Sequence, residues 1–88
     1  MKQSTLSIKM DEGKWLVDVF TKNRDDGIYE LIAPNQSAEV SLDPDDMYGF
    51  RYHLTGAPRT AFCIKLDDTV LAEGEVDESG MKEGRGVI

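Results

Sequence analysis

The sequence lacks several features that would place the protein outside the class of small globular domains. It has one cysteine among 88 residues, so no internal disulfide can hold the fold together. No stretch approaches the roughly 18 consecutive apolar residues that a membrane-spanning helix needs. Residues 1–9 contain no apolar segment of the kind found in secretory signal peptides. We therefore expect a cytoplasmic protein that is not bound to a membrane.

Basic residues are also scarce, because 10 Lys and Arg stand against 17 Asp and Glu and leave a net charge of −7. Proteins that bind nucleic acid directly gain much of their affinity by neutralising phosphates with basic side chains. Anionic membranes attract basic segments for the same reason. The charge therefore argues against both kinds of surface, and we expect a protein partner.

What the sequence does contain is an alternation of apolar and polar residues with a period of two. Leu6, Ile8 and Met10 show it first, and it returns along the chain between clusters of Gly, Pro, Asp and Asn, a pattern typical of half-buried strands. No window of about ten residues has the 3.6-residue period of a helix. We predict one all-β domain over residues 1–88 with seven or eight short strands. Residues 78–88 are either the last edge strand or a flexible tail.

The turn residues predict which strands form hairpins. Residues 11–14 form the first turn, in which Gly13 takes a positive φ, and the next turns lie at 23–27 and 55–59. Apolar residues then pair across the strands. The register places Ile8 opposite Val17, Val19 opposite Leu31, and Tyr52 opposite Phe62.

Pro34 marks a break between two groups of strands. It has no N–H for a ladder, so we expect the chain to cross to a second sheet over residues 33–37. Strands with one apolar face need a second layer to bury it, so we predict a small antiparallel β-sandwich, with a small closed β-barrel as the alternative. The short strands, tight turns and proline crossover are similar to immunoglobulin-like sandwiches in architecture, a resemblance that implies no particular function.

Some apolar residues fall on the outward face of their predicted strands, and they form the first candidate site. Leu16 and Phe20 are out of phase with the core residues of their strand, and Ile28 and Ile32 lie near them in the predicted hairpin. An outward apolar patch marks a contact with another protein or with a second copy of the chain. The alternative is that this face is also buried inside the domain.

An acidic stretch without any Lys or Arg forms the second candidate site. Its six carboxylates belong to Asp67, Asp68, Glu73, Glu75, Asp77 and Glu78. Such a stretch can attract a basic partner, or imitate a nucleic-acid backbone and so inhibit a nucleic-acid-binding protein. It can equally be a solvated strand whose like charges prevent edge-to-edge pairing.

Clusters of Asp in three predicted turns raise calcium as a further hypothesis. The turns hold Asp43, Asp45 and Asp46, then Asp25 and Asp26, then Asp67 and Asp68. Calcium needs roughly six to eight oxygen ligands. However, Met47 and Tyr48 stand where an EF-hand loop requires Asp or Asn and Gly, and Asp is common in turns, so we assign no metal site. A carbohydrate-binding module is the related hypothesis, and it requires Trp15 or a tyrosine exposed on a flat face.

The sequence supplies no catalytic constellation. His53 and Cys63 would share a face in the predicted hairpin, but nothing orients His53 as a base, and a single Cys on a strand is usually a small packed side chain. The glycines of residues 80–86 lack the order and the Lys-Ser/Thr ending of a phosphate-binding loop. We therefore predict a non-enzymatic protein-interaction module without a cofactor, which binds a protein partner or itself. The acidic inhibitor is the first alternative, and the calcium- or carbohydrate-binding module is the second.

Overall fold

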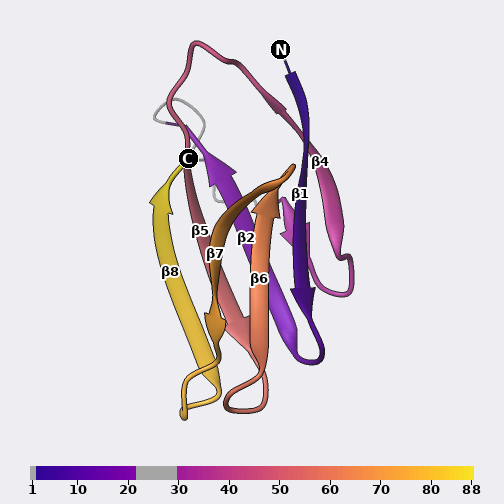
Figure 1. Cartoon of the computed structure of the whole chain (residues 1–88), viewed down its shortest axis with the longest axis vertical. Helices are drawn as coiled ribbons and strands as arrows, with labels where there is room; N and C mark the ends of the chain where they lie inside the picture. The colour runs from indigo at the N-terminus through magenta and orange to yellow at the C-terminus, as the bar shows by residue number, and fades with distance from the viewer. Residues whose placement is uncertain (1, 22–29) are drawn as a thin grey trace.

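The computed structural model describes residues 2–21 and 30–88, and these residues form eight β-strands and no helix (Figure 1). The strands are β1 (Lys2–Met10), β2 (Lys14–Phe20), β3 (Leu31–Ile32), β4 (Ser37–Leu42), β5 (Gly49–Thr55), β6 (Ala61–Leu66), β7 (Thr69–Glu75) and β8 (Met81–Val87). Two antiparallel sheets result: sheet A has the order β4-β1-β6-β7, and sheet B has the order β3-β2-β5-β8. The predicted all-β sandwich of seven to eight strands is confirmed. The closed barrel is wrong, because no described strand pairs from one sheet to the other.

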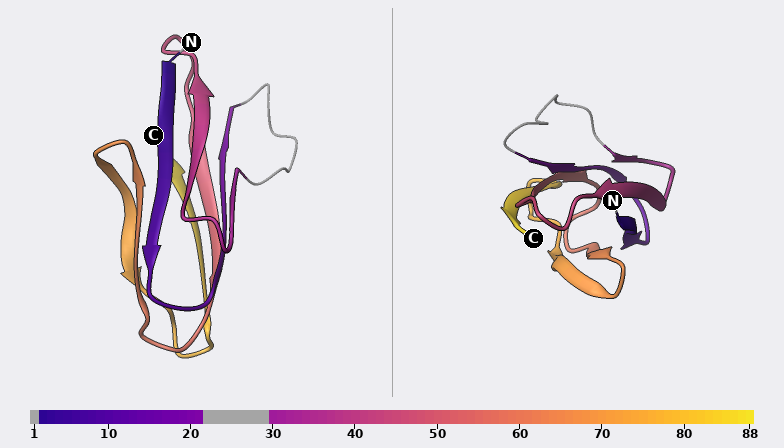
Figure 2. Two further views of the ribbon diagram at one scale, coloured as in Figure 1. Left: turned by 90° about the vertical axis from the view of Figure 1, so that its right-hand side faces the viewer. Right: turned by 90° about the horizontal axis from the view of Figure 1, so that it is seen from above.

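The core lies between the two sheets, whose layers are seen from the side and from above in Figure 2. Leu6 and Ile64 of sheet A and Leu54 of sheet B are completely buried there. Burying a side chain of this size contributes roughly 1.5–3 kcal/mol. The predicted inward faces are confirmed for Ile8 and Met10 of β1, Val17 and Val19 of β2 and Phe62 of β6. β7 departs from its apolar alternation, which predicts Val70 inward: Val70 is 45% exposed, and the ladder between β6 and β7 shifts its register at Ile64/Lys65.

The turn after β1 does not form the predicted hairpin, because β1 and β2 belong to different sheets. Ile8 has Ile64 of β6 as its ladder partner, whereas the sequence predicted Val17, which lies in sheet B. Gly13 has the predicted positive φ, at 103°, but its turn carries the chain from one sheet to the other. Facing strands of a sandwich bring apolar sides together just as neighbouring strands do, so the alternation fits both arrangements.

The loop after β5 also joins the two sheets, so the second predicted hairpin is wrong as well. Tyr52 belongs to sheet B and Phe62 to sheet A. Their rings nevertheless touch across the core, with centroids 5.7 Å apart and planes inclined by 49°. The predicted neighbours are therefore in contact, but between the layers and not within one sheet.

The predicted pairing of β2 with β3 is confirmed. Its register differs from the predicted one by two residues, so each side chain stays on the predicted face of the sheet. Leu31 lies opposite Val17, where the sequence predicted Val19. A shift of two residues keeps the same side chains on the same side of the sheet, and Leu31 is buried as expected. The predicted turn at residues 23–27 lies outside the described residues.

The chain crosses from sheet B to sheet A between β3 and β4, in the segment where Pro34 predicted it. The Ala33–Pro34 peptide bond is cis. The indole Nε1–H of Trp15 donates a hydrogen bond of 2.6 Å to the carbonyl oxygen of Asn35. This bond fastens the crossover to β2.

The C-terminal segment forms an edge strand, which was one of the two expectations for it. β8 pairs with β5 along its whole length. Gly84 and Gly86 lie beneath the rings of Tyr52 and Phe50, and a Cβ at Gly86 would come within 2.8 Å of Phe50 Cζ. These glycines therefore make room for aromatic side chains.

Candidate functional site

The outer face of sheet B, opposite the core, carries the first predicted patch only in part. Leu16 and Ile32 are ladder partners as neighbours in that patch should be, and Ile32 is 47% exposed. Phe20 lies farther along β2 on the same face, with Asp18 between it and Leu16. Ile28 lies outside the described residues. Leu16 and Phe20 therefore do not belong to one continuous apolar patch.

A buried ion pair separates Leu16 from Phe20. Asp18 is only 1% exposed, and its Oδ2 atom lies 2.8 Å from Nη2 of Arg51 on β5. The guanidinium carbon of Arg51 also lies 5.2 Å from the centroid of the Phe20 ring, within the range of a cation–π contact. Arg51 thus joins the buried carboxylate to the aromatic ring.

Phe20 belongs instead to a group of apolar side chains at the end of sheet B where β2 and β8 finish and β5 begins (Figure 1). Met47 is 82% exposed and Val87 is 75% exposed. Together with the half-buried Phe20 they line a hollow of about 470 Å³. We name Phe20, Met47 and Val87 the apolar corner. Gly49 is the ladder partner of both Phe20 and Val87, and a Cβ there would lie 2.9 Å from the Phe20 ring.

Three polar residues also line this hollow: Thr21 after β2, Tyr48 beside β5 and Arg85 of β8. The Tyr48 hydroxyl accepts a hydrogen bond of 2.7 Å from the backbone N–H of Asp43, which holds the ring in place. Aromatic residues, Met and Arg are the types enriched at protein–protein contacts. The corner can take up an apolar side chain of another protein, with the Arg85 guanidinium beside it for a carboxylate.

Sequence reasoning missed Met47, which is out of phase with Phe50 and Tyr52 at the start of its predicted strand, and it missed Val87, which has no clear alternation around it. Met47 follows an acidic turn, and Val87 follows a glycine-rich segment. The signal that could have found them is Phe20. A large aromatic residue on an outward face needs cover from the strands beside it, and the ladder puts Gly49 and then Val87 there.

The six carboxylates between residues 67 and 78 do not gather into one patch. Asp67 and Asp68 precede β7, Glu73 and Glu75 lie on it, and Asp77 and Glu78 follow it. β7 has seven residues. At 3.3 Å per residue it separates the two outer pairs by about 23 Å. The Asp67 carboxylate also accepts a hydrogen bond of 2.9 Å from the N–H of Thr5, and Asp77 Oδ1 lies 3.8 Å from Lys82 Nζ.

Two of the three acidic turns considered for calcium meet at one end of the molecule. Asp43, Asp46, Asp67 and Asp68 line a shared hollow of about 470 Å³. The Asp43 carboxylate already accepts a hydrogen bond of 2.9 Å from the N–H of Asp45, as in an Asx turn. In residues 2–21 and 30–88 no group of three or more His, Cys, Asp or Glu side chains is placed to hold a metal ion. The turn with Asp25 and Asp26 lies outside these ranges.

His53 and Cys63 are not neighbours, contrary to the predicted hairpin. They lie on the outer faces of different sheets, with the core between them. His53 Nδ1 is 3.3 Å from Glu83 Oε2, and Cys63 is a half-buried free thiol. This arrangement does not bring the imidazole to the thiol.

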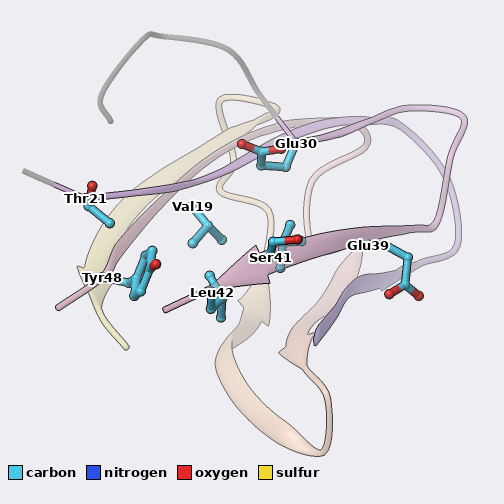
Figure 3. A pocket seen from close by; sticks show the side chains of 8 residues that line it. Val19, Thr21, Glu30, Glu39, Ser41, Leu42 and Tyr48 are labelled. Atoms are coloured by element: carbon cyan, nitrogen blue, oxygen red, sulfur yellow. The ribbon is translucent and has the colours of Figure 1, made fainter. Parts of the chain in front are cut away.

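A smaller cavity of about 220 Å³ opens between β2 of sheet B and β4 of sheet A (Figure 3). Its lining consists of Val19, Thr21, Glu30, Glu39, Val40, Ser41, Leu42 and Tyr48. In Figure 3 the side chains of Val19, Leu42 and Tyr48 gather together, whereas Glu39 lies apart from them. Small-molecule pockets usually measure about 300–1,000 Å³. The cavity is below this range, so we do not treat it as a ligand site.

Comparison with known proteins adds no relative from which a function could be transferred. No helix in the described part of the chain is long and apolar enough to cross a membrane. No protein-family model matches the sequence, and neither a curated protein nor a solved structure matches it at a significant level.

Proposed function

We propose that the protein is a non-enzymatic protein-interaction module and that the apolar corner is its contact surface. The observation that carries the proposal is the exposure of Met47 and Val87, at 82% and 75%, beside the half-buried Phe20. Leaving such side chains in water is costly, since each gains roughly 1.5–3 kcal/mol when it is buried. A contiguous exposed apolar group is therefore typical of a surface that a partner covers.

The groups around the apolar corner support a protein as the partner. Arg85 is exposed, and its guanidinium can form two parallel bonds to a carboxylate. Arg51 lies over the Phe20 ring and holds it in position before any partner arrives, which lowers the entropy cost of binding. A fixed aromatic ring next to Arg is the composition of many binding hot spots.

The geometry gives less support to an acidic inhibitor that imitates nucleic acid. Duplex DNA carries one phosphate charge for about every 1.7 Å of its axis. The six carboxylates are spread along β7 and the turns at both its ends, a much wider spacing. Asp67 and Asp77 are also engaged in contacts within the chain.

The carbohydrate and calcium hypotheses gain little from the structure either. Trp15 is 6% exposed and its indole N–H is bonded to Asn35, so its ring is not available for stacking on a sugar. The acidic turns use the carboxylates of Asp43 and Asp67 as acceptors for backbone N–H groups. Both hypotheses therefore rank below a protein contact.

We further propose that the sandwich is immunoglobulin-like. In that architecture one sheet contains strands A, B and E and the other contains C′, C, F and G. Assigning β1 to β5 as B, C, C′, E and F reproduces these neighbours, with β8 in the place of G and β6 in the place of A.

The free thiol of Cys63 supports a reducing compartment, and we propose the cytoplasm.

The experiment that tests the proposed contact surface is site-specific photo-crosslinking in cells that express the protein. A photoreactive phenylalanine analogue replaces Met47 in one variant and Val70 in the control variant, because Val70 is also exposed, at 45%, but lies on sheet A. We expect a discrete crosslinked protein from position 47 and none from position 70. The Phe20→Ser substitution should weaken the crosslink from position 47.

The proposal fails if positions 47 and 70 give the same crosslinked products, or if neither position gives a discrete product. Thermal unfolding of the Phe20→Ser variant serves as the folding control. It distinguishes a lost contact from a lost fold.

A further inference from the structure

β8 has an open edge. The hydrogen bonds between β8 and β5 show which backbone N–H and C=O groups of β8 point toward β5 and which point to the open edge. At one end of that ladder the N–H of Gly56 donates to the carbonyl of Gly80, and at the other the N–H of Ile88 donates to the carbonyl of Tyr48. Hydrogen-bonded residues alternate along an antiparallel strand. The even-numbered residues of β8 therefore direct their N–H and C=O groups toward β5.

The odd-numbered residues of β8 direct their backbone groups to the other side. They are Met81, Glu83, Arg85 and Val87. Among the described strands none pairs with β8 on that side, where it forms the outer edge of sheet B (Figure 1). An unpaired edge of this kind is a template for a further strand.

The side chains of the same odd-numbered residues lie on the outer face of sheet B. The even positions face inward, because Gly84 and Gly86 lie beneath the rings of Tyr52 and Phe50. All four odd-numbered residues are exposed. The edge therefore presents two charged side chains between two apolar ones.

The charge of β8 differs from that of the chain as a whole. β8 contains Lys82, Glu83 and Arg85, whereas β7, the corresponding edge of sheet A, contains Glu73 and Glu75. Two copies of a chain with a net charge of −7 repel each other. Because β8 carries charges of both signs, two β8 strands can approach each other without repulsion between like charges.

We propose that β8 pairs with β8 of a second copy of this chain, antiparallel and centred on Gly84. The inference rests on the proposed function, since it names a partner for the edge strand that contributes Arg85 and Val87 to the lining of the apolar corner. In this register Glu83 of each copy lies opposite Arg85 of the other, and Met81 lies opposite Val87. Opposite charges and apolar side chains in such cross-strand positions stabilise a sheet.

The symmetry of the pair selects this register. An antiparallel two-fold pair keeps the outer faces of both sheets on the same side, so residues that share a face lie opposite each other. The two nearest registers that meet this condition are centred on Glu83 or on Arg85. Each places two like charges directly opposite each other, which is destabilising. The register centred on Gly84 places no like charges in opposite positions.

Two features of β5 favour this pairing of Glu83 and Arg85. His53 Nδ1 lies 3.3 Å from Glu83 Oε2 and restrains the carboxylate on the outer face. Arg85 has Arg51 as its ladder partner in β5, so a carboxylate on its open side offsets the nearby positive charge. Met81 of the copy also covers Val87, which belongs to the apolar corner.

The experiment is sedimentation equilibrium of the full chain with two charge variants, Glu83→Arg and Arg85→Glu, measured alone and as an equal mixture. The wild-type chain should form a dimer. Each single variant has like charges at both positions, and its dimer dissociation constant should rise by about ten-fold or more. In the mixture one chain has arginine at both positions and the other has glutamate, so a heterodimer should form and show that both variants fold.

The matched control is Glu75→Arg on β7, an equally large charge change at the edge of sheet A, and it should leave the β8 contacts intact. The pairing is overturned if the wild-type chain stays monomeric up to about 0.5 mM. It is also overturned if neither β8 variant weakens the dimer, or if the mixture stays monomeric.

The outcomes separate this inference from the proposed function. A monomeric wild-type chain whose position 47 crosslinks to a different protein overturns the β8 pairing and supports the interaction module. A dimer that depends on Glu83 and Arg85, without any crosslink from position 47, supports the pairing and overturns the apolar corner as the contact surface.

Discussion

The Oδ2 atom of Asp18 and the Nη2 atom of Arg51 lie 2.8 Å apart on the outer face of sheet B, where the Asp18 side chain is 2% exposed. A carboxylate withdrawn from water to this extent costs several kcal/mol unless a cation and hydrogen bonds compensate it. The Arg51 side chain keeps 25% of its surface exposed and reaches from the carboxylate to the Phe20 ring. The pair separates the Leu16 region of the face from the apolar corner.

Replacing Arg51 with Ala should lower the free energy of unfolding by about 2–4 kcal/mol, because the buried Asp18 carboxylate then loses its cation. Urea denaturation measures the effect. The double variant Asp18→Ala with Arg51→Ala should lose less than the sum of the two single losses, since the two side chains act on each other.

Additive losses from Asp18→Ala and Arg51→Ala would contradict the coupling. His53→Ala is the control for a surface contact, because the Glu83 side chain opposite it is 67% exposed. Exposed ion pairs contribute about 0–1 kcal/mol, so this variant should change the stability little.

Gly86→Ala should destabilise the protein by about 1–3 kcal/mol, because the added methyl group meets the buried Phe50 ring and forces one of them to move. The Cβ would lie 2.8 Å from Phe50 Cζ. Lys82→Ala is the control on the same face of β8. Equal stability of the two variants in thermal unfolding would show that the glycine does not have the role assigned to it.

Trp15→Phe should cost about 1–3 kcal/mol, because it removes the indole N–H that bonds the crossover carbonyl of Asn35 and leaves unfilled volume in the core. Circular dichroism in a urea series gives the value.

Trp15 is the one tryptophan of the chain and is 6% exposed, so the fluorescence of the wild-type protein should shift to longer wavelength on unfolding. A native spectrum already typical of a water-exposed indole would contradict the described burial.

The inward faces of most strands could be predicted from the sequence. The pairing of β2 with β3 could also be predicted, but the partners of β1 could not. Ile8 is buried whether it pairs with Val17 or, as the structure has it, with Ile64. Alternation reports which side of a strand is apolar, and both arrangements bury that side. The positive φ of Gly13 is likewise compatible with a hairpin and with a turn between layers.

The apolar corner could likewise be predicted only in part. Phe20 could be recognised because it is out of phase with the core residues of its strand. Met47 and Val87 come from distant segments, and the pairings of β2 with β5 and of β5 with β8 bring them to Phe20. The acidic stretch looks continuous in the sequence, yet β7 extends it over a length that separates its ends.

Amide hydrogen exchange on β8 tests whether this edge strand of sheet B pairs with a second copy of the chain, as proposed. The N–H groups of Glu83 and Arg85 point to the open edge, and that of Gly84 points to β5. At about 0.5 mM wild-type protein we expect slow exchange at Glu83 and Arg85, and at least about ten-fold faster exchange at Arg85 in the Glu83→Arg variant, with Gly84 slow in both. Fast exchange at Glu83 and Arg85 in the concentrated wild-type protein would contradict the proposed pairing of β8.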